Sequence, residues 1–120
     1  MLYKSTVLPE IKIGQVWCLP PPGTKKILIV AIDTALNGYV INVLIEDGQD
    51  INGVKSALAP LEWDVLKIQL DKVVEERDVS EHIDSYEEWK EMAQEGKAGF
   101  WQCTPAEVLA TIRQNMSADS

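Results

Sequence analysis

The sequence predicts an α+β fold: a twisted antiparallel sheet, or a small partly open β-barrel, with two helices near the C-terminus. The first observation is a pair of runs rich in Ile, Val and Leu within residues 26–46, separated by Asn37-Gly38. β-Branched side chains favour strands and Asn-Gly favours a tight reversal, so this stretch predicts a central β-hairpin. The second observation is that clear helix-capping patterns appear only after residue 80.

Further strands are expected on both sides of the hairpin. Glu10–Leu19 alternates apolar positions around Gly14, which predicts a first strand bent at that glycine. Val54–Ala59 predicts a short strand returning along the sheet. The second hairpin strand, residues 39–45, carries apolar residues on both faces, which is typical of a central strand. Residues 1–9 show little pattern and predict a loose or edge-packed lead-in.

Residues 61–76 are ambiguous. Leu61, Val65 and Ile68 recur at helical spacing after Pro60, which suits a first helical turn. The later apolar positions also fit a strand. We favour a short helix at about 61–67 followed by a strand to about 76, and a single helix is the alternative.

The next segment predicts a helix from Asp84 to Gly96. Asp84 suits the N-cap, Glu87 follows three residues later as in a capping box, and Gly96 favours termination. One face of this helix is apolar and would contact the sheet: Tyr86, Trp89 and Ala93.

The C-terminal region predicts a short aromatic strand at Gly99–Cys103 and then a second helix. Thr104-Pro105-Ala106-Glu107 is a capping box with proline at the first helical position. Ser117–Ser120 is expected to be a frayed tail.

Length and composition predict a single domain, residues 1–120, in the cytoplasm. The chain is 46% hydrophobic and 25% charged, as in ordinary globular proteins. No apolar run reaches the roughly 20 residues of a membrane span, and the first residues do not resemble a secretory signal. The net charge of −8 argues against nucleic acid and anionic membranes as partners. Cys18 and Cys103 are expected to be free, buried thiols.

No group of residues predicts catalysis. The single histidine, His82, lies in a polar stretch that predicts a solvated surface side chain. Two cysteines are too few for a zinc site, and the glycines are scattered as turn residues rather than gathered in a phosphate-binding loop. We therefore expect no cofactor, no metal and no enzyme activity; the only conceivable acid–base groups are the carboxylates of residues 75–95.

The acidic charge is concentrated in one segment. Residues 71–95 hold ten acidic and three basic side chains, a net charge of −7, whereas residues 1–70 sum to −1. On the predicted helix the carboxylates form one stripe, with Glu87 beside it, and only Lys90 offers relief: Asp84, Glu87, Glu88, Glu91 and Glu95. We call these five residues the acidic face. It is either a solvated surface that maintains solubility or a surface that docks a basic partner.

Two functional hypotheses follow. The first is a non-catalytic acidic binding protein, of the kind represented by immunity proteins and antitoxins, that inhibits a basic protein such as a nuclease toxin. The alternative is a structural or adaptor module that binds a peptide or a complex subunit through the open edge of the sheet.

Short motifs resemble a family of small bacterial single-domain proteins without a characterised function. The similar pieces are Ile13-Gly14-Gln15-Val16-Trp17, Gly38-Tyr39-Val40-Ile41-Asn42-Val43, Tyr86-x-x-Trp89 and Gly96-Lys97-Ala98-Gly99-Phe100. The resemblance spans about residues 11–112 and implies a fold but no activity.

Overall fold

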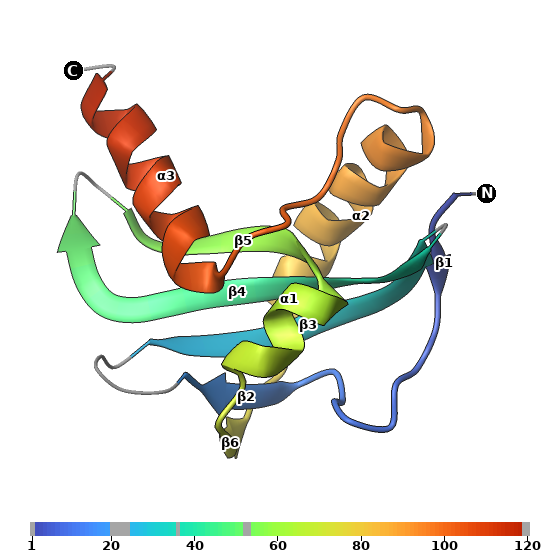
Figure 1. The fold of residues 1–120 in the computed structure, drawn as a ribbon, viewed down its shortest axis with the longest axis horizontal. Helices are drawn as coiled ribbons and strands as arrows, with labels where there is room; N and C mark the ends of the chain where they lie inside the picture. Colours follow the sequence, from blue (N-terminus) through green and yellow to red (C-terminus); the bar gives the residue numbers. More distant parts are fainter. Residues whose placement is uncertain (1, 20–24, 36, 52–53, 119–120) are drawn as a thin grey trace.

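The computed structural model describes residues 2–19, 25–35, 37–51 and 54–118, and it shows an open antiparallel sheet with helices on both faces (Figure 1). The six strands are β1 (Lys4–Ser5), β2 (Gln15–Cys18), β3 (Lys26–Ala35), β4 (Gly38–Ile51), β5 (Val54–Glu62) and β6 (Lys72–Glu76). The helices are α1 (Trp63–Leu66), the 3₁₀ turn η1 (Lys67–Gln69), α2 (Ser80–Gln94) and α3 (Pro105–Ala118). The predicted α+β class is confirmed, and the sheet does not close into a barrel.

The predicted hairpin is the centre of the sheet. The strand order is β5-β4-β3-β2-β6, and β1 also pairs with β3. β3 and β4 pair from Lys26 opposite Glu46 to Ala35 opposite Gly38, with a register shift between Ile29 and Ala31. β4 lies between β3 and β5, so it is a central strand, as its apolar residues on both faces predict.

The sheet separates two hydrophobic layers. α1 and α3 cover one face, where Trp63, Leu66, Val108 and Leu109 pack on the odd-numbered side chains of β4 such as Ile41 and Val43. α2 covers the opposite face, with Tyr86 and Ala93 in its core (Figure 1). The two C-terminal helices are therefore on opposite faces of the sheet, and only α2 belongs to the strongly acidic segment.

The N-terminal residues are more ordered than the sequence suggests. β1 pairs with the end of β3, and Tyr3 and Leu8 are only 4% and 8% exposed. The predicted first strand is shorter than Glu10–Leu19, because β2 begins only after the bend at Gly14. Gly14 has a φ of 95°, and an added Cβ would lie 3.1 Å from the carbonyl oxygen of Arg77, so glycine is required there.

Residues 54–76 confirm the favoured interpretation of the ambiguous segment. A short helix and one 3₁₀ turn end at Gln69, and β6 follows at Lys72–Glu76. β5 extends to Glu62, beyond the predicted end at Ala59. Pro60 does not end the strand, because β5 is an edge strand and a proline there does not remove a hydrogen bond between strands.

The prediction that Asp84 caps the acidic helix is wrong. α2 begins at Ser80, so Asp84 and Glu87 both lie inside it. Asp78 binds the first residue of the helix instead. Its Oδ1 accepts hydrogen bonds from the Ser80 N–H at 3.0 Å and from the Ser80 hydroxyl at 2.5 Å. Packing of the preceding turn against the sheet, through residues such as Ile83, favours the earlier start. The predicted termination at Gly96 is confirmed by its φ of 76°.

The capping box of α3 forms as predicted. The Glu107 N–H donates to Thr104 Oγ1 at 3.2 Å, and the Thr104 N–H donates to Glu107 Oε1 at 3.1 Å. The predicted strand Gly99–Cys103 is wrong, because only Trp101 makes a bridge, to Leu61. α3 extends through Ala118, into the predicted tail, and residues 119 and 120 lie outside the described part of the chain.

Candidate functional site

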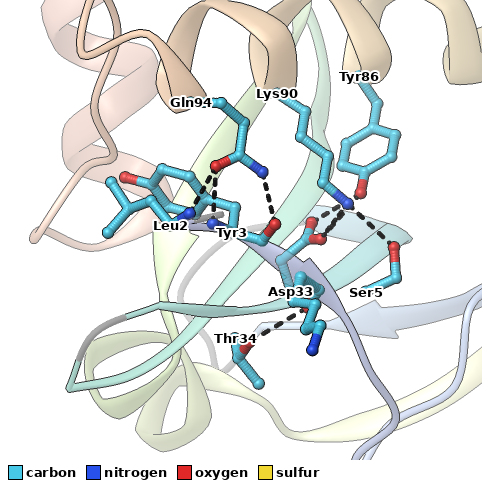
Figure 2. A network of polar contacts seen from close by, with 9 residues as sticks. Leu2, Tyr3, Ser5, Asp33, Thr34, Tyr86, Lys90 and Gln94 are labelled. Atoms are coloured by element: carbon cyan, nitrogen blue, oxygen red, sulfur yellow. Dashed lines mark hydrogen bonds and ion pairs between the residues drawn. The ribbon is translucent and has the colours of Figure 1, made fainter.

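The inward face of α2 carries a buried charge network (Figure 2). Lys90 Nζ lies 2.9 Å from Asp33 Oδ1, and the Asp33 side chain is 0% exposed. The Tyr86 hydroxyl donates to the same carboxylate, at 3.0 Å from Oδ1 and 2.8 Å from Oδ2. Lys90 also donates to the Ser5 hydroxyl of β1 at 3.1 Å. One carboxylate from β3 thus joins α2 to the sheet through two side chains one helical turn apart.

Burial and charge act in opposite directions on Lys90. Burial by itself lowers the pKa of a lysine, but the hydrogen bonds to Asp33 and Tyr86 outweigh it, and the pKa of Lys90 is raised. Burial is the main cause of the raised pKa of Tyr86, followed by its hydrogen bond to Asp33. At neutral pH Lys90 is therefore charged and Tyr86 is a neutral hydrogen-bond donor.

A second polar contact fixes the C-terminal end of α2. Gln94 Oε1 accepts the backbone N–H groups of Leu2 and Tyr3 at 2.8 and 2.9 Å, and its amide donates to the Tyr3 carbonyl (Figure 2). The Tyr3 ring also meets Trp89 edge-on, with ring centroids 5.1 Å apart. The start of the chain is consequently held against α2 by both backbone and ring contacts.

The outward face of α2 shows the opposite arrangement. All five residues of the acidic face are exposed: Asp84, Glu87, Glu88, Glu91 and Glu95. Glu95 lies 3.2 Å from Lys97, an exposed pair of little energetic value. Across the described ranges, the other four carboxylates have no cationic or hydrogen-bonding partner. The structure therefore places four of the predicted carboxylates at exposed positions of α2 and the fifth, Glu95, directly after its end.

The orientation of Lys90 is the feature that sequence reasoning missed. From the sequence, Lys90 is the only base that relieves the acidic face, but in the structure its charge is opposed by Asp33 on the inward side. The available signal was a single acidic residue, Asp33, at the end of an otherwise apolar strand, together with Tyr86 and Lys90 at a spacing of four. No local rule connects these residues, because the fold alone brings β3 beneath α2.

The other candidate residues are the single histidine and the two cysteines. His82 is not solvated as predicted: its side chain is 19% exposed, and Nε2 lies 3.3 Å from Glu81 Oε1. Cys18 and Cys103 are free but half-buried rather than buried. Burial and the nearby charge of Glu107 raise the pKa of Cys103, which disfavours the reactive thiolate. Within the described residues, no group of three or more His, Cys, Asp or Glu side chains is arranged to hold a metal.

The two edges of the sheet differ. The outer side of β5 is occupied near its end, because the Trp101 N–H donates to the Pro60 carbonyl at 2.8 Å and the Glu62 N–H donates to the Trp101 carbonyl at 3.0 Å. β6 is an open edge whose five residues are all exposed, including Val73 and Val74 at 40% and 42%. It is short and charged, and its pairing with β2 contains a register shift, features that usually discourage strand addition.

Comparison of the chain with family models, with curated proteins and with solved structures gives no match. The resemblance to a family of small bacterial proteins therefore stays a prediction from short motifs. Among the helices of the described residues, none has the length and apolar character needed to cross a membrane.

Proposed function

We propose that this protein is a non-catalytic binding protein that docks a basic protein partner on the acidic face of α2. The observation that carries the proposal is the inward orientation of Lys90, the only lysine or arginine of α2, which lies 2.9 Å from Asp33. The charge of Lys90 is opposed by Asp33 inside the protein, so it does not compensate the carboxylates that α2 exposes to solvent.

The energetics of the helix favour a cationic partner. Like charges three or four residues apart destabilise a helix by about 0.2–0.5 kcal/mol per pair. A basic surface placed against Asp84, Glu88 and Glu91 would relieve that repulsion and accelerate encounter through long-range attraction. The same field repels nucleic acid, so a protein surface that binds nucleic acid is the complementary partner. This supports the narrower hypothesis of an immunity- or antitoxin-type inhibitor of a nuclease.

A second candidate function is favoured by the open edge of β6. Its outer backbone groups and the half-exposed Val73 and Val74 favour the addition of a strand from a peptide or complex subunit, whereas the shortness, charge and register shift of β6 oppose it. Backbone hydrogen bonds carry little net charge, so such binding would depend weakly on salt. Salt dependence therefore separates the two candidates.

The test is affinity capture from the native host, followed by a salt titration of the captured complex. Charge reversal at Glu88, Glu91 and Glu95 to Lys should weaken capture steeply and flatten the salt dependence. The matched control reverses three exposed carboxylates elsewhere: Glu10, Asp64 and Glu76. Both variants change the net charge equally, so an equal loss in both would mean that only total charge matters. Binding that ignores salt and the α2 reversal would contradict the proposal.

A further inference from the structure

A cavity of about 310 Å³ opens at the end of the sheet, lined by the end of β3, the start of β4 and the N-terminal residues Leu2 and Tyr3. Its aromatic lining comes from three separate segments, Tyr3 before β1, Tyr39 in β4 and Phe100 after α2. Glu62, Asn37 and Gln102 add polar groups to the wall. The volume is at the lower end of the range for ligand sites, about 300–1,000 Å³, so it suits a group of a few atoms rather than a large cofactor.

The walls of this cavity are held by contacts outside it. Tyr3 is 4% exposed and packs edge-on against Trp89, and Gln94 binds its backbone on both sides (Figure 2). Trp89 Nε1 donates to the Gly99 carbonyl at 2.8 Å, which fixes the segment before Phe100. The cavity is therefore formed before any ligand arrives, and binding would require little ordering.

Among the described residues of the lining, Glu62 alone is acidic, and none of them is basic. It is half-buried at the end of β5, and over the described part of the chain its carboxylate has no ion pair or hydrogen bond. Its backbone N–H is bonded to Trp101, so the backbone of this residue is fixed even though its carboxylate is free. A carboxylate without a partner is available to oppose the charge of a cation in the cavity.

We propose that this cavity binds the alkylammonium group of a small organic cation. Aromatic side chains attract cations through the negative faces of their rings, most strongly where water is excluded, and quaternary ammonium ligands are the group most often bound this way. Glu62 supplies the opposing charge, and Asn37 and Gln102 add side-chain amide groups to the wall. A metal ion is disfavoured because one carboxylate is too few ligands, and an anion would be repelled by Glu62. This site does not use the acidic face of α2, so the two proposals fail independently.

The experiment compares choline with 3,3-dimethylbutanol, which has nearly the same shape and no charge. Each is titrated into the full chain while backbone amide NMR signals are followed. Choline should shift the amides of residues 37–39, 62 and 100–102, and the alcohol should shift them far less. Equal responses to both would overturn the proposal, because the cavity would then be an apolar pocket. No response to choline or to tetramethylammonium would overturn it as well.

Glu62→Gln should weaken choline binding about tenfold. The variant should fold normally, since Glu62 makes no side-chain cap bond to α1. Glu76→Gln is the matched control, an exposed carboxylate outside the cavity lining that should leave choline affinity unchanged. Phe100→Leu removes a ring and should also weaken binding of choline, but not of the alcohol. Unchanged choline affinity in both cavity variants would contradict the assignment.

Two sources supply the same chemical group, and the titration distinguishes them. A free small cation is indicated if choline binds at least as tightly as a short peptide containing trimethyllysine. A side chain of another protein is indicated if the peptide binds more tightly and Glu62→Gln weakens both.

Discussion

Both faces of α2 are next to carboxylates, but the inward carboxylate is buried and paired with a cation, whereas the outward carboxylates are exposed. On the inward face Lys90 lies 2.9 Å from Asp33, and the Tyr86 hydroxyl donates to the same carboxylate. On the outward face Asp84 and Glu88 lie one turn apart with no cation beside them in the described residues. The net charge that a helix presents to solvent therefore depends on whether its basic side chains point inward or outward. From the order of charges along the sequence, Lys90 would be assigned to the acidic face rather than to Asp33.

The largest expected effect comes from breaking the inward pair. Lys90→Met should lower the free energy of unfolding by about 3–5 kcal/mol, because it leaves Asp33 charged, buried and unopposed by a cation. Urea unfolding measures the loss.

The double variant Lys90→Met/Asp33→Leu sharpens this result. It removes both charges, so it should be less destabilised than the single variant, with only the Tyr86 hydroxyl losing its acceptor. If Lys90→Met unfolds at the same urea concentration as the wild type, the inward pair does not exist in solution.

A smaller effect is expected from the neutral member of the network. Tyr86→Phe removes the donor to Asp33 and should cost about 1–3 kcal/mol of unfolding free energy. Tyr39→Phe is the matched control, because within the described residues the Tyr39 hydroxyl has no hydrogen-bond partner. Equal stability of the two variants in thermal unfolding would show that the Tyr86 hydrogen bonds contribute nothing.

The pH dependence of stability should come from the inward face at alkaline pH. The pKa values of Lys90 and Tyr86 are both raised in the folded protein, so the folded state binds their protons more tightly than the unfolded chain does. Their stabilisation is complete below the unfolded pKa values, about 10 for both residue types, and is lost as pH rises through the folded values.

Unfolding free energies measured from neutral pH upward test this expectation. The curve should be flat with respect to these two groups up to about pH 10 and then fall. The unfolding free energy of the Lys90→Met/Asp33→Leu variant should fall less steeply with pH. A rise in wild-type stability above that pH would contradict the raised pKa values.

The smallest change in unfolding free energy is expected on the outward face, where a substitution should stabilise the protein rather than destabilise it. Glu88→Gln removes a like charge from Asp84 and Glu91 at once, so it should stabilise the protein by about 0.2–0.5 kcal/mol for each pair. The gain should shrink in high salt, which screens exposed charges. Glu76→Gln on β6 should give no comparable gain. Destabilisation by Glu88→Gln would mean that Glu88 has a favourable contact in solution.

Local patterns predicted the parts of the fold that local interactions determine. The hairpin at 26–46 follows from β-branched runs around Asn37-Gly38, and the start of α3 follows from the reciprocal bonds of Thr104 and Glu107. The exposed carboxylates of α2 share one side because helical spacing alone fixes which residues do so, and that this side binds a partner stays a prediction. All of these depend on residues close together in the chain.

Predictions failed where tertiary packing decides. α2 begins four residues before Asp84, the predicted start, because Asp78 and the packing of Ile83 on the sheet override the N-cap preference of Asp84. The pairing of Lys90 with Asp33 and the cavity beside Glu62 were missed for the same reason: each joins residues far apart in sequence.

The most direct test of the account is to map where a basic probe binds. An oligolysine peptide is titrated at low salt into wild type, into the Glu88/Glu91/Glu95→Lys variant and into the Glu10/Asp64/Glu76→Lys control, while backbone amide NMR signals are followed. We predict shifts concentrated at residues 84–95 in the wild type and the control, and their loss in the α2 variant. Shifts spread evenly over every exposed carboxylate, or unchanged at 84–95 in the α2 variant, would contradict the claim that α2 presents a distinct surface for a basic partner.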